Sequence, residues 1–166
     1  MLGELIMAEF IIDECIKETF EFYKNFCSYV SEDCDSEFDE PATLEKIEQW
    51  EKENNTELPH QYKSWLLLTS GCNLFNNTIS MCFPELGCME EKDDIIIVGC
   101  NMGTESQYYI KRDTGTACFF FDSLMEETEF DSVEELLYEI IYDGECEYSD
   151  YLDEGWEDDF NNKYGY

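Results

Sequence analysis

Apolar residues recur every three or four positions in four stretches of the chain, which is the spacing of an amphipathic helix. The longest of these stretches carries several Phe and Tyr side chains on a widened apolar face. Short β-branched and aromatic runs lie between the third and fourth stretches and indicate strands. The sequence predicts helices from Phe10 to Val30, Leu44 to Asn54, Leu58 to Gly71 and Ser132 to Tyr142.

Two of the predicted helices carry clear end signals. Pro59 suits the first turn of its helix, because its fixed φ is helical and its missing N–H would have no partner there; Gly71 is expected to end that helix. Ser132 and Glu135 form a capping box at the start of the last helix. Gly144 is expected to stop the same helix.

Proline and glycine residues mark the expected ends of the strands and the turns between them. The first strand is expected to end at Pro84, which would remove a ladder hydrogen bond if the strand continued. Gly99 and Gly103 bracket a predicted turn. The segment Arg112-Asp113-Thr114-Gly115 has the composition of a hairpin turn, with Gly where a positive φ is needed. The predicted strands are Thr78 to Phe83, Asp94 to Val98, Gln107 to Lys111 and Thr116 to Phe121.

Helices that precede a series of strands predict an α+β protein. We expect N-terminal helices packed on a mostly antiparallel sheet of about four to six strands, followed by a closing C-terminal helix. A chain of 166 residues is long enough to bury a core as a single domain.

Acidic residues dominate the composition. The chain has 41 Asp and Glu against nine Lys and Arg, a formal net charge of -32. Such a surface repels phosphates and anionic lipids, so direct binding to nucleic acid or to a membrane is not expected. The start of the chain lacks the basic segment of a signal peptide, and no long uncharged apolar run is present. We therefore expect a cytoplasmic protein.

Nine cysteines raise the question of a disulfide framework or a metal site. Their number is odd, no two are spaced as C-x-x-C, and His60 is the single histidine of the chain. We therefore expect reduced thiols that pack as small hydrophobic side chains in a reducing compartment. No metal and no cofactor are predicted.

Acidic and aromatic residues are interleaved near the C-terminus. From Asp122 to Asp159 there are 17 Asp or Glu and no Lys, Arg or His. One interpretation is a solvated face that keeps the protein soluble. The other is a binding surface, because Tyr and Trp anchors within a field of carboxylates suit a basic protein partner. The candidate contacts for such a surface are Glu126, Glu127, Glu129, Asp150, Tyr151, Asp153, Glu154 and Trp156.

Catalytic interpretations find little support. The carboxylate pairs are too numerous to single out a general acid and base or a Mg²⁺ site. The segment from Asp33 to Glu37 begins like a calcium loop, but Phe38 replaces the required Gly and Leu44 the required Glu. Nucleophilic catalysis would depend on His60 in a helix first turn. We therefore predict a protein that is not an enzyme.

The middle of the chain also resembles a known family. The helix from Leu44, the Leu58-Pro59 pair, the hydrophobic run after it and the Ser70-Gly71 turn are similar to the opening of the SUKH superfamily. That superfamily consists largely of bacterial immunity proteins against secreted toxins, with some eukaryotic and viral members. The resemblance implies structural roles for Leu58, Pro59, Tyr62, Trp65, Leu66, Gly71, Gly99 and Gly103.

The resemblance divides this single domain into three parts. Residues 1–38 are expected to form an N-terminal helical extension and acidic connector, and residues 39–144 the SUKH-like core. Residues 145–166 are expected to form an acidic, aromatic tail docked on that core. The apolar face of the N-terminal helix either packs in the core or serves as a docking surface.

The resemblance implies an immunity protein, and the charge implies binding to a basic partner. We expect a protein that neutralises a cognate toxin by direct contact; if the toxin is a nuclease, carboxylates would take the place of phosphates on its basic surface. The alternative is an intracellular scaffold or regulator of the same superfamily that docks partners on its N-terminal helix. A third hypothesis is an acid-dependent hydrolase with metal-stimulated turnover. The sequence does not indicate an oligomeric state.

Overall fold

The computed structural model describes residues 9–88, 94–121 and 125–166. The apolar start of the chain at residues 1–8 and the first carboxylate of the C-terminal acidic run, Asp122, lie outside the described residues. Within them the protein is α+β, as predicted, with helices packed against an antiparallel sheet.

The sheet is a simple meander in which every strand pairs antiparallel with the next strand in the sequence. Its seven strands in the described residues exceed the number expected, because β1, β2 and β7 are too short or too polar to be recognised from their pattern. The strands are β1 (Glu37–Phe38), β2 (Cys72–Leu74), β3 (Ile79–Gly87), β4 (Ile95–Asn101), β5 (Ser106–Lys111), β6 (Ala117–Phe121) and β7 (Glu126–Phe130).

The predicted helices are present, and the helix predicted from Ser132 carries its expected N-terminal cap. Ser132 Oγ accepts a hydrogen bond from the Glu135 N–H at 3.1 Å, and the Glu135 carboxylate accepts one from the Asp131 N–H at 2.9 Å. The capping box is therefore confirmed, one residue wider than its usual form. The helices are α1 (Glu14–Tyr29), α2 (Leu44–Asn54), α3 (His60–Leu66), α4 (Val133–Tyr148), the 3₁₀ turn η2 (Ser149–Tyr151) and α5 (Trp156–Tyr164).

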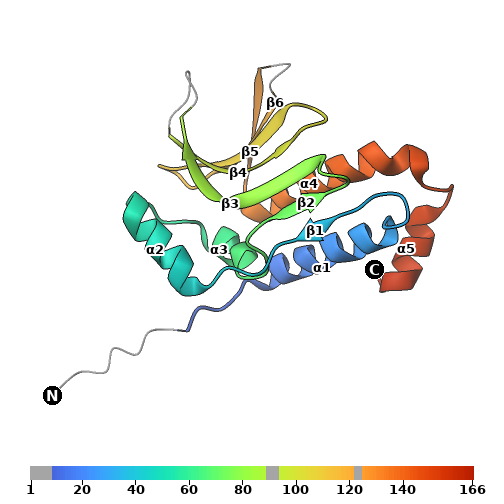
Figure 1. Cartoon of the computed structure of the whole chain (residues 1–166), viewed down its shortest axis with the longest axis horizontal. Coiled ribbons are helices and arrows are strands. Elements are labelled where there is room, and N and C mark those ends of the chain that lie inside the picture. The colour runs from blue at the N-terminus through green and yellow to red at the C-terminus, as the bar shows by residue number, and fades with distance from the viewer. Residues whose placement is uncertain (1–8, 89–93, 122–124) are drawn as a thin grey trace.

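The main core lies between the sheet and the layer formed by α1, α3 and α4 (Figure 1). Tyr23 and Phe26 of α1 and Trp65 of α3 are almost fully buried there. Phe160 of α5 is also buried and packs edge-on against Phe26. The apolar face of α1 is thus occupied by the core, and the C-terminal residues lie against α1.

A second, smaller cluster lies on the other face of the sheet. It joins Ile95, Tyr109, Cys118 and Phe120, with Ile97 packed against it. Side chains on a strand alternate between its two faces, so neighbouring residues such as Tyr108 and Tyr109 enter different clusters. Both faces of the central strands are therefore buried.

Two strand predictions need correction. β3 continues past Pro84 to Gly87, because a register shift between Met81 and Glu85 places the proline at an irregularity where no ladder hydrogen bond is required of it. Gly99 is not a turn residue but lies within β4, where a Cβ would come 2.4 Å from the carbonyl oxygen of Ser80. Its role is close approach of two backbones, whereas Gly103 does lie in the turn between β4 and β5.

α1 begins at Glu14, with Asp13 as its N-cap, rather than at Phe10. Two helix ends that were predicted at glycines also differ from the prediction. α3 ends at Leu66, and the chain then turns so that Gly71 approaches β3, where a Cβ would lie 2.6 Å from the Met81 carbonyl oxygen. α4 does not stop at Gly144 but continues through it to Tyr148. In both cases glycine marks a close contact between elements rather than the end of a helix.

Candidate protein-interaction surface

Three of the predicted contact residues lie on β7, the last strand of the sheet. Glu126, Glu127 and Glu129 follow one another on a strand that is exposed over most of its length. β7 pairs with β6 on one side, and the order of the sheet leaves its other side at the edge. An edge strand presents unpaired backbone groups, and charged side chains on it deter unwanted strand pairing.

The three carboxylates differ in how strongly the protein itself engages them. Glu127 accepts a hydrogen bond from the Tyr109 hydroxyl and forms an ion pair with Lys111 at 3.1 Å. Lys111 also pairs with Glu129, whose side chain is 56 % exposed, against 25 % for Glu127. Glu126 and Glu129 are consequently better placed than Glu127 to meet a partner.

Cys118, Glu127 and Glu129 bring ligand-capable atoms within 4.8 Å of one another and form a possible metal-binding group. The Lys111 ammonium already pairs with both carboxylates and offsets one of their two negative charges. A divalent cation would have to displace that ammonium. The arrangement is therefore better explained as an internal ion pair than as a metal centre.

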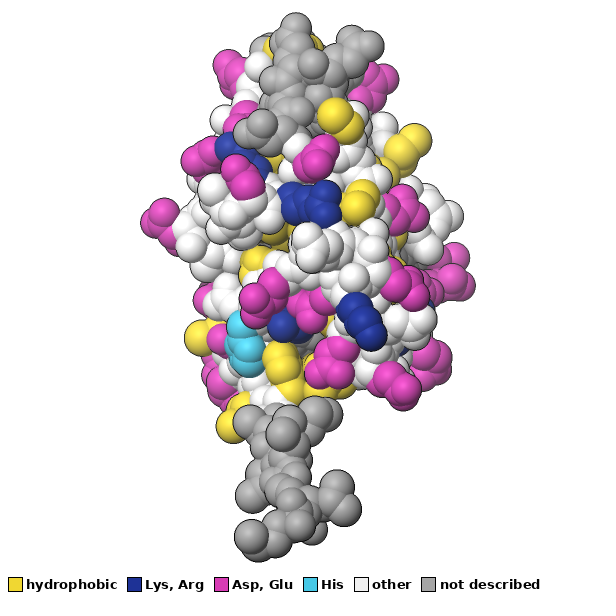
Figure 2. Space-filling view, turned by 90° about the vertical axis from the view of Figure 1, so that its left-hand side faces the viewer, with side chains coloured by type: hydrophobic (Ala, Val, Ile, Leu, Met, Phe, Trp, Pro, Cys, Tyr) yellow, Lys and Arg dark blue, Asp and Glu magenta, His cyan; other side chains and the backbone are white. Residues whose placement is uncertain are grey.

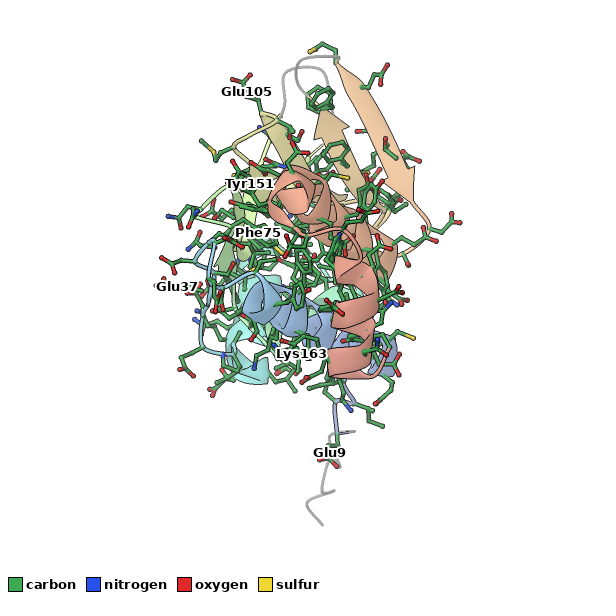
Figure 3. The ribbon with its side chains drawn as sticks, turned by 90° about the vertical axis from the view of Figure 1, so that its right-hand side faces the viewer. Glu9, Glu37, Phe75, Glu105, Tyr151 and Lys163 are labelled. Atoms are coloured by element: carbon green, nitrogen blue, oxygen red, sulfur yellow. The ribbon has the colours of Figure 1, made fainter. Side chains whose placement is uncertain are left out.

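The remaining predicted contacts lie between α4 and the first turn of α5. Asp150 and Tyr151 belong to η2, and Tyr151 is 71 % exposed; Asp153 and Glu154 are exposed in the turn that follows. Figure 3 shows Tyr151 at the C-terminal end of α4, which faces the viewer. These four side chains form a second acidic patch.

Trp156 belongs to a different environment from its predicted neighbours. It is half-buried at the start of α5, and its ring lies 5.8 Å from Phe26 and 6.2 Å from Tyr29 of α1, measured between ring centroids. Most of its surface thus serves to hold α5 against α1.

The structure does not bring the two groups of predicted contacts together. β7 leads into the beginning of α4 and η2 follows its end, and a helix of 16 residues is about 24 Å long. In Figure 1 α5 lies at the right-hand end, well to the right of the orange strand that stands beside the β6 label. The acidic run of the sequence therefore forms two separate patches, the β7 edge and the η2–α5 turn.

The positions that fit the superfamily pattern lie around α3. Leu58, Tyr62, Trp65 and Leu66 are buried in the main core, and the Tyr62 hydroxyl donates a hydrogen bond to the Cys82 carbonyl at 3.3 Å. Pro59 occupies the residue before the helix rather than its first turn. These residues have structural roles in the packing of α3 on the sheet.

Beside Pro59 lies a hollow of about 960 Å³ between the α2–α3 connection and the β5–β6 hairpin. Arg112, the only arginine in the chain, donates hydrogen bonds to the Thr56 hydroxyl and the Asn54 carbonyl and lies 3.5 Å from Asp94. Gly115 closes the hairpin with a φ of 71°, as predicted. This hollow was not predicted from the sequence. The one sequence feature that relates to it is the single arginine, Arg112, in the predicted hairpin turn.

Comparison with known protein families finds a match over the part of the chain that contains α2, α3 and most of the sheet. The model of the SMI1/KNR4 family (SUKH-1) matches residues 41–158, which is most of the chain. The chain belongs to the SMI1/KNR4 (SUKH-1) family. No curated protein matches it. The matched region begins at the residues just before α2, so α1 packs into the core of this SUKH-1 protein from outside the matched region.

Charge is distributed unevenly over this SUKH-1 protein. The face that carries α2 shows Lys and Arg side chains among its carboxylates (Figure 2). The described segment from Met125 to Asp159 contains no Lys, Arg or His. A basic partner would therefore experience the strongest attraction on the side of β7, α4 and the η2–α5 turn.

Within that side, the SUKH-1 protein also holds a partly buried carboxylate that was not predicted from the sequence. Asp143 of α4 accepts a hydrogen bond from the Tyr108 hydroxyl of β5 at 3.1 Å. Burial raises the pKa of Asp143 to about 6, against the opposing effect of the Tyr108 hydrogen bond. Nearby, Asn101 accepts hydrogen bonds from the N–H groups of Gly103 and Thr104 and so holds the β4–β5 turn. This is a structural polar cluster between α4 and the sheet.

Among the described residues, no helix is both long and apolar enough to cross a lipid bilayer. The nine cysteines all lie in described segments, and none of them is joined to another in a disulfide. His60 stacks on Phe10 with 4.6 Å between ring centroids. That aromatic contact gives the single histidine a packing role.

Proposed function

We propose that this protein is a non-enzymatic immunity protein that neutralises a basic protein toxin in the cytoplasm by covering its functional surface. Membership of the SUKH-1 family supports an immunity or regulatory role. The observation that carries the proposal further is the row of carboxylates on the open edge strand β7. The exposed carboxylates could pair with Lys or Arg of a basic partner, and the unpaired backbone groups beside them could hydrogen-bond to a strand of that partner.

The net charge of -32 supports a partner of opposite sign. Fields of this kind raise association rates by roughly 10- to 10³-fold at low salt, which suits an inhibitor that must act before its target does. If the toxin is a nuclease, its nucleic-acid site is basic, and carboxylates of β7 would occupy the positions of phosphates. The η2–α5 turn, with Tyr151 as its exposed aromatic anchor, would supply a second contact.

The regulator hypothesis in its original form placed the partner on the apolar face of α1. Ile16, Tyr23 and Phe26 of that face are buried in the core, so these residues are not available to a partner. A regulatory role would need another surface, and no specific observation favours it over immunity.

The direct test is a pull-down from lysate of the source organism with the tagged protein, at low and high salt, followed by mass spectrometry. A basic protein that is lost as salt rises, that kills cells when expressed alone and that is harmless when co-expressed with this chain would establish the function. Recovery of salt-resistant partners that are not toxic would refute it.

Variants then locate the surface. Glu126→Lys with Glu129→Lys should weaken the complex by at least about tenfold and reduce its salt dependence, since rim charges act mainly on association. Glu45→Lys with Glu48→Lys on α2 changes the net charge equally at exposed positions away from β7, and should have a smaller effect. Equal effects of the two pairs would show that overall charge, not the β7 edge, governs binding.

A further inference from the structure

Two hollows meet beside α1 and α4, apart from the carboxylates of β7 and from the η2–α5 turn. One, of about 790 Å³, lies along α1 beside Leu68 and the C-terminal Tyr166. The other, of about 490 Å³, lies along α4 beside Phe130. Phe22 and Tyr138 line both hollows, so the two form one continuous depression, which we call the α1–α4 groove.

Three tyrosines that line the groove expose much of their aromatic surface to solvent. Tyr138 is 45 % exposed, Tyr142 57 % and Tyr166 55 %. Phe22 lines the groove together with these tyrosines, and its ring centroid lies 5.3 Å from that of Tyr166. Tyrosines that present an apolar ring and a polar tip are enriched in protein interfaces, where they contribute large contact area at low entropic cost.

Carboxylates surround this aromatic strip. Lys17 is the one cation in the lining of either hollow, and it is already paired with Glu14 at 2.9 Å. The rim therefore carries a strongly negative charge on both sides of an apolar floor. The six acids are Glu14, Glu18, Glu21, Glu135, Glu139 and Glu145.

We propose that the α1–α4 groove docks a basic amphipathic helix of a partner protein. The walls are two helices, and a third helix fits between them by packing its apolar ridge against Tyr138, Tyr142 and Phe22. Lys or Arg residues flanking that ridge would meet the carboxylates of the rim. An acidic or purely apolar helix would leave these charges uncompensated.

This inference goes beyond the proposed function, because the groove contains none of the acidic contacts proposed on β7 or in the η2–α5 turn; Phe130, at the end of β7, is the one residue of either surface that lines it. A toxin could use either surface or both, and a partner unrelated to any toxin could use the groove alone. The two proposals therefore stand or fall separately.

The test uses the full-length protein and three synthetic 18-residue peptides of identical Leu and Lys content. The first has Leu at helical spacing, the second has the same residues in scrambled order, and the third alternates Leu and Lys as a strand would. Isothermal titration calorimetry should show saturable binding of the helical peptide, with an affinity at least about tenfold above the other two. Equal binding of the three would overturn the proposal, because charge alone would then explain the interaction.

Variants place the bound peptide. Tyr138→Ala with Tyr142→Ala should weaken binding of the helical peptide by at least about tenfold, since truncated interface anchors typically cost more than a factor of ten. Tyr151→Ala removes a more exposed aromatic side chain outside the groove and should leave the affinity unchanged. Thermal unfolding of each variant establishes that it folds. Unchanged affinity in the folded double variant would overturn the proposal.

Charge and self-association provide the remaining tests. Glu18→Gln with Glu21→Gln should reduce the salt dependence of peptide binding, whereas Glu126→Lys with Glu129→Lys on β7 should leave the preference for the helical peptide intact. Loss of that preference in the β7 variant would contradict the assignment to the groove. If sedimentation shows a dimer that Tyr138→Ala dissociates, the groove is occupied by a second copy and the proposal is wrong.

Discussion

The Tyr108 hydroxyl and the Asp143 carboxylate are joined by a 3.1 Å hydrogen bond that ties α4 to the centre of the sheet. Both groups are withdrawn from water, and burial raises the pKa of the Tyr108 phenol as well as that of Asp143. Glu139 and Glu147 on the same helix add negative charge near Asp143 and oppose its ionisation further. At neutral pH the fold therefore holds an ionised carboxylate in an unfavourable position.

Asp143 makes stability fall as pH rises through the range from about 4 to about 6. Its pKa is about 6 in the folded protein, against 3.8 when unperturbed, so the folded state binds more protons between these values. Its stabilising contribution is complete below about pH 4 and is lost above about pH 6. Asp143→Asn, which keeps a hydrogen-bond acceptor for Tyr108, should raise stability at pH 7 by on the order of 1 kcal/mol, a figure reduced for partial exposure.

Urea unfolding of the two proteins at pH 4, 5, 6 and 7 measures this difference. The general repulsion among 41 acids also weakens the fold as pH rises, so the informative quantity is the gap between wild type and variant. That gap should open between pH 4 and 6. Glu45→Gln on α2 provides a control, because it removes one exposed charge and leaves Asp143 and the acids that raise its pKa in place. A constant gap across this range would mean that Asp143 titrates normally.

Gly144→Ala should destabilise the protein although it replaces glycine in the middle of a helix. In an exposed helix the change gains up to about 1 kcal/mol. Here an added Cβ would lie 2.1 Å from the ring of Phe75, whose carbonyl is also held by the Tyr148 hydroxyl at 3.0 Å. Overpacking of this kind costs about 1–3 kcal/mol. Chemical denaturation should show a clear loss, whereas Glu139→Ala on the same helix should change stability by less than about 0.5 kcal/mol.

The glycines and the proline show where sequence reasoning reaches its limit. Helical spacing located α1, α2 and α4, and hairpin chemistry located the turn at Gly115, because these features depend on neighbours in the sequence. Gly71, Gly99 and Gly144 instead meet backbone or rings that are distant in the sequence. Pro84 is tolerated because of a register shift that depends on β4. Local patterns contain no information about such encounters.

Prediction of the candidate surface from the sequence was limited in the same way. The acidic run is evident in the sequence, but its division into the β7 edge and the η2–α5 turn depends on α4 running between them. The sequence of β7 does not indicate a strand. An edge strand can expose both of its faces, and it then lacks the alternation of apolar and polar residues that identifies a strand. The α1–α4 groove combines residues from α1, α4 and the C-terminus, which only the packed structure brings together.

Phe160 should be the residue on which the docking of α5 depends most. It is 2 % exposed, and its ring contacts those of Phe22, Phe26 and Tyr29 on α1. Phe160→Ala should lower the free energy of unfolding by about 3 kcal/mol through lost burial and the cavity left behind. Tyr151→Ala, an aromatic truncation just before α5, should cost less than about 0.5 kcal/mol. Similar losses in the two variants would mean that α5 does not stabilise the core.

The cysteines should divide into two classes by reactivity, because only the thiolate attacks an alkylating reagent. Burial raises the pKa of Cys27 to about 11 and also raises that of Cys72 well above its usual value, while Cys15 and Cys146 are exposed. With iodoacetamide, an uncharged reagent that the acidic surface does not repel, Cys15 and Cys146 should be alkylated in the folded protein at pH 8. Cys27 and Cys72 should react only after unfolding in guanidinium chloride, as peptide mapping by mass spectrometry can follow. Alkylation of Cys27 in the native protein at the rate of Cys15 would show that α1 separates readily from the core, contrary to the packing of Tyr23 and Phe26.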